Sequence, residues 1–398
     1  MKLNLPYFLI LLNINIQPIY GLLPIHGLRP FLYLLTILLT IYYFLSHRSE
    51  FSLIRRYKPF YIYSCLLIYH CINCYVQQVP LGEDTSGNYF YFFLQFFPNL
   101  CVLFLTYVTF IKDEKRTLKL LLYAFSFYML LAFSQVTPEE GTGRLISSDI
   151  HPNMFAQLAG IGLMLGLLYN SFCLHSKLMT IAVWVLPVAS ILGCGSRNGL
   201  SLLFLAITAF FVSNIISTGI NYKKVASFIL ALFCISFIII YIINNTEVGQ
   251  RMVDMQSKAN EYEMHTGTIL DILGEREVYY ILGWYNFVSN PVFGIGLRNF
   301  AYYNNFIHPL HSEYMIHLCE GGFVGAILYC RFLWDISKGL FSRIRSGLRT
   351  KGCLIVFMFI AYLFVGVTGR EMYYSYFFPL LAIVSAYSNS KNSKYDNI

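Results

Sequence analysis

Repeated long apolar segments are the feature that most constrains this chain of 398 residues. Each segment has roughly 17–23 residues, close to the length that a helix needs to cross the hydrocarbon of a bilayer. Soluble domains seldom contain even one such segment, and here they follow one another along the chain. We therefore predict an all-α integral membrane protein with about twelve transmembrane helices. The predicted helices are 7–23, 30–46, 59–78, 90–111, 117–134, 154–170, 178–194, 199–216, 225–244, 313–335, 352–369 and 372–388.

The composition agrees with this class of protein. Only 12% of the residues are charged and the mean hydropathy is +0.58, whereas a soluble domain carries about 25% charged residues. No small-residue cleavage site follows the first apolar run, so we expect that run to be a retained helix rather than a signal peptide. Cys71 and Cys74 form a C-x-x-C pair inside an apolar run. Because no second pair accompanies them, we expect buried residues rather than a redox or zinc site.

The basic residues set the orientation. With the N-terminus in the cytoplasm, most of the 28 lysines and arginines fall on short cytoplasmic loops, as the positive-inside rule requires. Both termini are then cytoplasmic. The net charge of +8 is spread over several loops and does not form one basic face, so nucleic acid is not an expected partner.

The predicted spans divide the chain into three parts. Residues 1–244 form an N-terminal transmembrane bundle of about nine helices, and residues 313–398 add about three more. Between them, residues 245–312 form one large outward loop, and a smaller outward loop covers 135–153. Long ordered loops are usually functional.

Few ionisable residues fall inside the predicted spans. Ion-coupled transporters generally need carboxylates or histidines at membrane depth. The polar chemistry of this chain is instead concentrated at the outer helix ends and in the two outward loops. We therefore favour a reaction at the outer membrane surface over a transport pathway through the bilayer.

Several outward polar residues have two interpretations. Arg197, within Gly195-Ser-Arg-Asn-Gly199, either snorkels to lipid headgroups or presents its planar fork to phosphate oxygens. Arg276 precedes an aromatic helix and either pairs with a nearby acid or binds a ligand. Asn153 is placed to cap the helix that starts near Met154, and Arg144, seven residues before His151, remains unexplained.

His311 lies at the outer end of the helix predicted for 313–335. A lone interfacial histidine is more often structural than catalytic, and His317 lies further into the helix. Gly322 and Gly325 have i,i+3 spacing and predict close helix packing. Glu320 either orients His311 or pairs with a helix neighbour.

Taken together, these segments resemble the O-antigen polymerase and ligase superfamily. The resemblance rests on Gly274-Glu-Arg276 followed by Trp284, on Asn290-Pro-Val-Phe-Gly-Ile-Gly-Leu-Arg-Asn-Phe300, and on His311-Ser312 with the later glycines. The earlier Gly195-Ser-Arg-Asn-Gly199 looks like the arginine motif of that family. Arg144 with Asn153 resembles its preceding outward-loop motif.

The resemblance implies a GT-C-like, metal-independent glycosyltransferase of the bacterial inner membrane, with its active site on the periplasmic side. The donor would be a glycan on undecaprenyl pyrophosphate and the acceptor a second glycan. Arg197 and Arg276 carry over as ligands of the leaving pyrophosphate, and His311 as general base. Further candidates for substrate binding are Arg144, Asn153, Trp284, Arg298 and Glu320. No cofactor or metal is implied, and the partners would be membrane lipids and a chain-length regulator or flippase.

Two members of the family would share this donor chemistry. A polymerase joins surface-polysaccharide repeat units, whereas a ligase moves the glycan onto lipid A–core. Ligases often have leucine four residues after the first arginine, where this chain has Ser201. With Asn153 and the long outward loop, this favours the polymerase. A flippase for the same lipid-linked sugar is a third interpretation, and it would line a cavity with charges at membrane depth.

Overall fold

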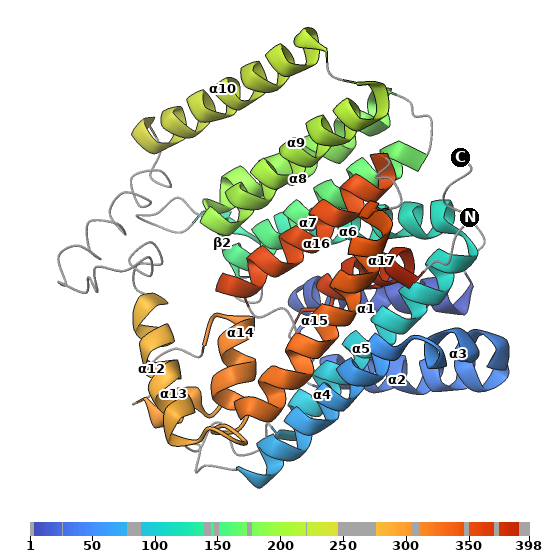
Figure 1. Ribbon diagram of the computed structural model, residues 1–398, viewed down its shortest axis with the longest axis vertical. Helices are drawn as coiled ribbons and strands as arrows, with labels where there is room; N and C mark the ends of the chain where they lie inside the picture. Colours follow the sequence, from blue (N-terminus) through green and yellow to red (C-terminus); the bar gives the residue numbers. More distant parts are fainter. Residues whose placement is uncertain are drawn as a thin grey trace.

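The computed structural model describes residues 4–25, 27–77, 89–138, 145–146, 151–172, 177–219, 221–245, 276–304, 310–345, 350–369 and 374–389. These residues are almost entirely helical (Figure 1). A short antiparallel pair, β1 (Thr137–Pro138) and β2 (Leu145–Ile146), is the exception in the described part. The prediction of an all-helical chain is confirmed.

With one exception, described below, each long apolar run forms one helix, and the helices follow the predicted ranges closely. In chain order they are α1 (Leu5–Leu22), α2 (Leu28–Ser46), α3 (Arg48–Arg55), α4 (Lys58–Val76), α5 (Tyr89–Lys112), α6 (Glu114–Phe133), α7 (Pro152–Phe172), α8 (Lys177–Cys194), α9 (Arg197–Thr218), α10 (Tyr222–Asn245), α12 (Arg276–Ser289), α13 (Phe300–Tyr303), α14 (Glu313–Met315), the π-helix η2 (Ile316–Glu320), α15 (Gly322–Arg345), α16 (Thr350–Thr368) and α17 (Phe377–Asn389).

Six of the described helices, α1, α2, α6, α7, α9 and α16, are long and apolar enough to cross a membrane. Shorter apolar segments lie in α5, α8 and α17. The total of about twelve spans stays a prediction.

The outer surface of α2 shows how these helices suit a lipid environment. Its apolar side chains Leu34, Leu38 and Ile41 are exposed on one face, while Thr36 and Thr40 are buried on the other. In water such a helix would turn its apolar face inward. An exposed apolar stripe over buried hydroxyls is typical of a helix whose outer face contacts lipid.

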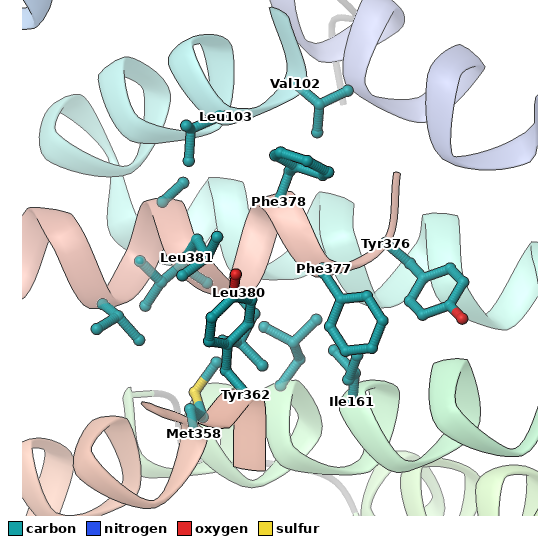
Figure 2. Close-up of a cluster of buried hydrophobic side chains, with 14 of the residues drawn as sticks. Val102, Leu103, Ile161, Met358, Tyr362, Tyr376, Phe377, Phe378, Leu380 and Leu381 are labelled. Atoms are coloured by element: carbon teal, nitrogen blue, oxygen red, sulfur yellow. The ribbon is translucent and has the colours of Figure 1, made fainter. Parts of the chain in front are cut away.

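The last helix, α17, lies at the centre of the bundle. It packs against α5, α7, α15 and α16, and every residue from Phe377 to Tyr387 is buried. Figure 2 shows Phe378 facing Val102 of α5, and Phe377 near Tyr362 of α16. A helix that is apolar on all sides is either buried in a core or spans a membrane, and α17 is enclosed by other helices. Helices from both ends of the chain thus share one core.

One predicted helix is wrong. The range 313–335 does not form a single helix, because the chain breaks at Gly321 and Gly322, between η2 and α15. A π-turn leaves carbonyls without their usual helical partners. Here the carbonyls of Cys319 and Glu320 accept hydrogen bonds from the turn that follows α12, as described below.

The predicted outward loop 245–312 is only partly described. Residues 246–275 and 305–309 lie outside the described residues. The remainder forms α12, a turn over residues 290–299, and α13, and then enters α14. In Figure 1, α12 and α14 lie near one another at the lower left of the bundle.

Candidate functional site

The C-terminal end of α16, residues 363–369, is a meeting point for several segments; we call it the α16 end. Its carbonyls receive three side-chain hydroxyl groups. Ser312 Oγ donates to Gly366 O at 3.3 Å, Tyr314 OH donates to Leu363 O at 2.8 Å, and Tyr280 OH of α12 donates to Val367 O. The last four carbonyls of a helix lack partners within it, and those of Gly366 and Val367 are among them, whereas Leu363 lies further into α16. The three hydroxyl groups tie α12 and the start of α14 to α16.

The first turns of α7 and α9 lie at the same end of the bundle. A Cβ added to Gly369 would stand 3.3 Å from Nε2 of Gln157, in the second turn of α7. One added to Gly199, in the first turn of α9, would stand 2.7 Å from Cβ of Ala156. The glycine beside Arg197 therefore permits close contact between α9 and α7. As a result, α7, α9, α12 and α14 all present their N-terminal turns or starts near the α16 end.

Arg197 is the first residue of α9. Ser196 caps the helix, its Oγ accepting the N–H of Gly199 at 3.5 Å. The Arg197 side chain is exposed. A helix N-terminus attracts anions through its free N–H groups and the helix dipole. An exposed guanidinium at that position strengthens the attraction, so this end of α9 is suited to a phosphate group.

Asn153 does not cap α7 as predicted. The helix begins at Pro152, so Asn153 lies within the first turn, and its backbone N–H donates to Nδ1 of His151 at 3.2 Å. Proline is favoured at the first helical position because it has no N–H to satisfy. His151 therefore occupies the capping position, and Asn153 stands on the turn beside Ala156.

His311 is partly exposed between two buried neighbours, Leu310 and Ser312. Its ring centroid lies 6.4 Å from that of Tyr279 on α12, in an edge-to-face arrangement. The backbone of Arg276 begins α12, about one turn before Tyr279. The fold therefore brings the start of α12 and His311 to the same place, although the Arg276 side chain lies outside the described residues, as does Arg144.

Residues 290–299, which we call the glycine turn, dock by backbone contacts onto the break between η2 and α15. Ile295 N donates to Cys319 O at 3.1 Å and Gly296 N donates to Glu320 O at 3.0 Å. Gly294 has a φ of +71°, and a Cβ on it would lie 2.5 Å from the backbone nitrogen of Gly322. A side chain cannot fit there, so both glycines of this contact are required by geometry.

Arg298 and Glu320 belong to this docking region. Arg298 has a φ of +67°, unusual for a residue with a side chain. It follows Leu297, whose carbonyl accepts from Cys74 Sγ at 3.6 Å, and precedes Asn299, which donates to Gln77 O at 2.6 Å. These contacts place Arg298 beside the C-terminal end of α4.

Glu320 is buried, and its carbonyl accepts from Asn73 Nδ2 at 3.0 Å as well as from the glycine turn. In this segment Glu313 contacts His317. That Glu320 orients His311 stays a prediction.

Trp284 lies on the outer face of α12. It is 53% exposed and its ring contacts Phe287, which packs edge-to-face on Phe323 of α15. Tyr285 and its neighbour along the exposed face, Val288, are likewise exposed. The structure thus turns Trp284 away from the buried face of α12 that carries Gly283, where a Cβ would lie 2.8 Å from Met315 Cε.

Sequence reasoning missed a polar stripe on α4. Tyr69, His70 and Asn73 lie on the face of α4 that packs against η2 and the glycine turn, and all three donate or accept hydrogen bonds there. Their i, i+1, i+4 spacing in an apolar run was the available signal. The expectation of almost no ionisable groups inside the spans is therefore wrong for this region, where His70, Glu313, His317 and Glu320 are buried.

The prediction that Cys71 and Cys74 are buried is confirmed. Cys71 and Cys74 are both buried free thiols. Within the described ranges, no group of three or more histidine, cysteine or carboxylate side chains has the arrangement of a metal site.

The fold and the site together define a helical bacterial membrane protein whose polar groups gather at one end of the bundle. Residues 181–330 match a family model described as O-antigen ligase. This range includes Arg197, the glycine turn and His311, and the match confirms the resemblance to the O-antigen polymerase and ligase superfamily. It supports a function of O-antigen ligase or polymerase type in the synthesis of surface polysaccharide. No curated protein matches the chain.

Proposed function

We propose that this protein polymerises repeat units of a surface polysaccharide that are linked to undecaprenyl pyrophosphate, at the periplasmic face of the bacterial inner membrane. One observation carries the proposal. The family match spans Arg197, Arg276 and His311, and the elements that bear them, α9, α12 and the start of α14, meet at the α16 end.

The proposed reaction breaks the bond between the anomeric carbon and the pyrophosphate oxygen. Negative charge develops on the departing pyrophosphate, and Arg197 with Arg276 would stabilise it by charge-assisted hydrogen bonds. The N-terminus of α9 adds its N–H groups and dipole to the same task. Because two guanidinium groups carry this charge, the reaction would need no metal ion.

His311 would act on the acceptor. A neutral imidazole can take the proton of the attacking hydroxyl, a contribution of about 10²–10⁴-fold to the rate. The partial exposure of His311 leaves its ring accessible to a glycan from the outward side. Attack in line with the departing pyrophosphate inverts the anomeric centre. The polyprenyl tail would lie against the apolar outer faces of the helices, as membrane lipids do.

Deletion of the gene in its own host tests this proposal. Lipopolysaccharide from the deletion strain is run on a silver-stained gel, and the strain is complemented with wild type, His311→Ala or Arg197→Ala. We expect the ladder to collapse to core plus a single repeat unit, and only wild type to restore it. Tyr285→Phe, an exposed conservative change on α12, serves as the matched control and should restore the ladder fully.

The second candidate function is that of an O-antigen ligase, because the matched family model is described by that name. A ligase transfers the finished glycan to lipid A–core, so its loss strips the core of all glycan while long polymer accumulates on the lipid carrier. That outcome would replace the polymerase by the ligase. An unchanged ladder in the deletion strain would contradict both activities on lipopolysaccharide.

A further inference from the structure

Three buried side chains form a continuous hydrogen-bonded chain beneath His311; we call it the acid–histidine chain. Glu313 Oε1 lies 3.1 Å from His317 Nε2, and His317 Nδ1 lies 2.8 Å from His70 Nε2. All three side chains are buried, with exposures of 0–1%. The chain links the start of α14 to the middle of α4, across η2.

The arrangement of donors fixes the direction of this chain. If the Glu313 carboxylate accepts from His317 Nε2–H, then the other nitrogen of a neutral His317 has no proton and accepts from His70 Nε2–H. The group left over is His70 Nδ1, which is buried without a partner. If His317 Nδ1–H instead donated to His70 Nε2, the proton of a neutral His70 would be on its buried Nδ1. A buried N–H without a partner is rarer in proteins than a buried acceptor without one. The chain therefore runs from His70 through His317 to Glu313.

The surroundings of the acid–histidine chain are shaped to hold it. The His317 ring lies 4.0 Å from the ring of Tyr329, centroid to centroid. A Cβ on Gly321 would lie 2.8 Å from Cε1 of His70, so the glycine makes room for that ring. Interiors of this density hold side chains in one rotamer. Of the two glycines predicted to allow close packing, Gly325 serves α4, because a Cβ on it would lie 3.5 Å from both Tyr69 and His70. Gly322 instead packs on the backbone of the glycine turn.

His311 is held from two sides by the residues that follow it. Ser312 donates to Gly366 O of α16, and Glu313 is joined through His317 to His70 of α4. Two anchors on different helices fix both the position and the rotation of a short segment. Well-packed apolar residues would stabilise the fold equally well or better than buried polar ones. The acid–histidine chain instead holds the segment that carries His311 in one position and orientation.

We propose that Glu313, His317 and His70 are positioning residues that set the place of His311 against the acceptor hydroxyl. This inference rests on the proposed function. A displacement of about 1 Å at a reacting group costs on the order of 10²-fold in rate. Breaking the chain should therefore lower kcat while leaving the KM for the lipid-linked donor nearly unchanged, because the arginines that bind pyrophosphate lie on other elements.

The test compares two substitutions at His70 in purified protein in lipid nanodiscs, with a lipid pyrophosphate-linked repeat unit as substrate. Gln places an amide N–H where Nε2–H stands, and Phe keeps the ring without a donor. We expect His70→Phe to lose about 10²-fold in kcat and His70→Gln to retain most of the activity. Ile72→Phe, on the exposed face of α4, is the matched control and should behave as wild type.

A second measurement separates positioning from general stability. If His70 acts through His311, then His70→Phe should cause no further loss in a His311→Ala background, since coupled residues are not additive. If His70→Phe does not yield folded protein, His317→Asn, which is too short to reach either neighbour, takes its place in the same comparison.

Three outcomes would overturn the inference. His70→Phe could equal wild type, it could raise the KM without lowering kcat, or its effect could persist in full without His311. Each of these leaves the proposed function intact, because wild type still polymerises and His311→Ala does so at a rate about 10²–10⁴-fold lower. Absence of polymer from the wild-type protein would instead overturn the proposed function itself.

Discussion

The contact between Gly294 and Gly322 offers the sharpest test of this structure. Substitution of Gly294 by Ala would place a Cβ 2.5 Å from Gly322 N and 2.6 Å from Cys319 O. Both are backbone atoms, which cannot rotate aside as a side chain can. The glycine turn would therefore have to move away from the break between η2 and α15.

The cost follows from what the movement breaks. A left-handed backbone with a Cβ costs about 1–2 kcal/mol. The two backbone hydrogen bonds from Ile295 and Gly296 to the broken helix contribute about 1 kcal/mol each, and more when their buried carbonyls are left unpaired. We therefore expect Gly294→Ala to lower the free energy of unfolding by about 3–5 kcal/mol.

Gly27→Ala is the matched control. Gly27 has a similar φ of +82°, but a Cβ on it would meet nothing within 4 Å. Gly27→Ala should lower the free energy of unfolding by only about 1–2 kcal/mol, the cost of a left-handed backbone with a Cβ. Unfolding in mixed detergent micelles is followed by tryptophan fluorescence, to which Trp284 on the adjoining α12 contributes. Equal losses for the two variants would refute the close backbone contact, and with it the docking of the glycine turn.

Three further predictions follow from the site. Arg197→Ala should lower the transfer rate by about 10²–10³-fold without changing the yield of folded protein, because the side chain is exposed. Arg197→Lys should recover part of the lost rate. Full activity of the alanine variant would contradict a phosphate role. Ser312→Ala should lower the free energy of unfolding by about 1–2 kcal/mol, since it removes both a helix cap and the bond to Gly366 O, and an unchanged unfolding curve would count against that anchor. Tyr280→Phe should cost about 1 kcal/mol through the lost bond to Val367 O, measured against Tyr285→Phe, which should cost nothing.

The sequence was sufficient to predict the helices because their length is set by the membrane. A run of about 20 apolar residues has few alternatives in a bilayer, where every backbone group must be satisfied within the segment. The start of α9 was predicted two residues too late, at 199 instead of Arg197, because the capping Ser196 was not considered. That Arg197 and His311 serve one site was predicted from family likeness rather than from local chemistry, and it stays a prediction.

What the sequence did not predict depends on contacts between distant segments. The break in 313–335 exists because Gly294, about 28 residues earlier, supplies a backbone that fits against Gly322. The polar stripe on α4 was missed because the range was judged by its long apolar run, although α4 is not among the helices apolar enough to cross a membrane. Asn153 was taken for a cap because its type favours that position, whereas the helix starts at Pro152, two residues before the predicted start at Met154.

The enclosed position of α17 has a consequence for how the protein is made. Chains are synthesised from the N-terminus, and segments fold as they appear. Because α17 is surrounded by α5, α7, α15 and α16, these four helices cannot close around their shared centre before α17 has been synthesised. The core at this point is therefore completed late, after all four of its neighbours have entered the membrane.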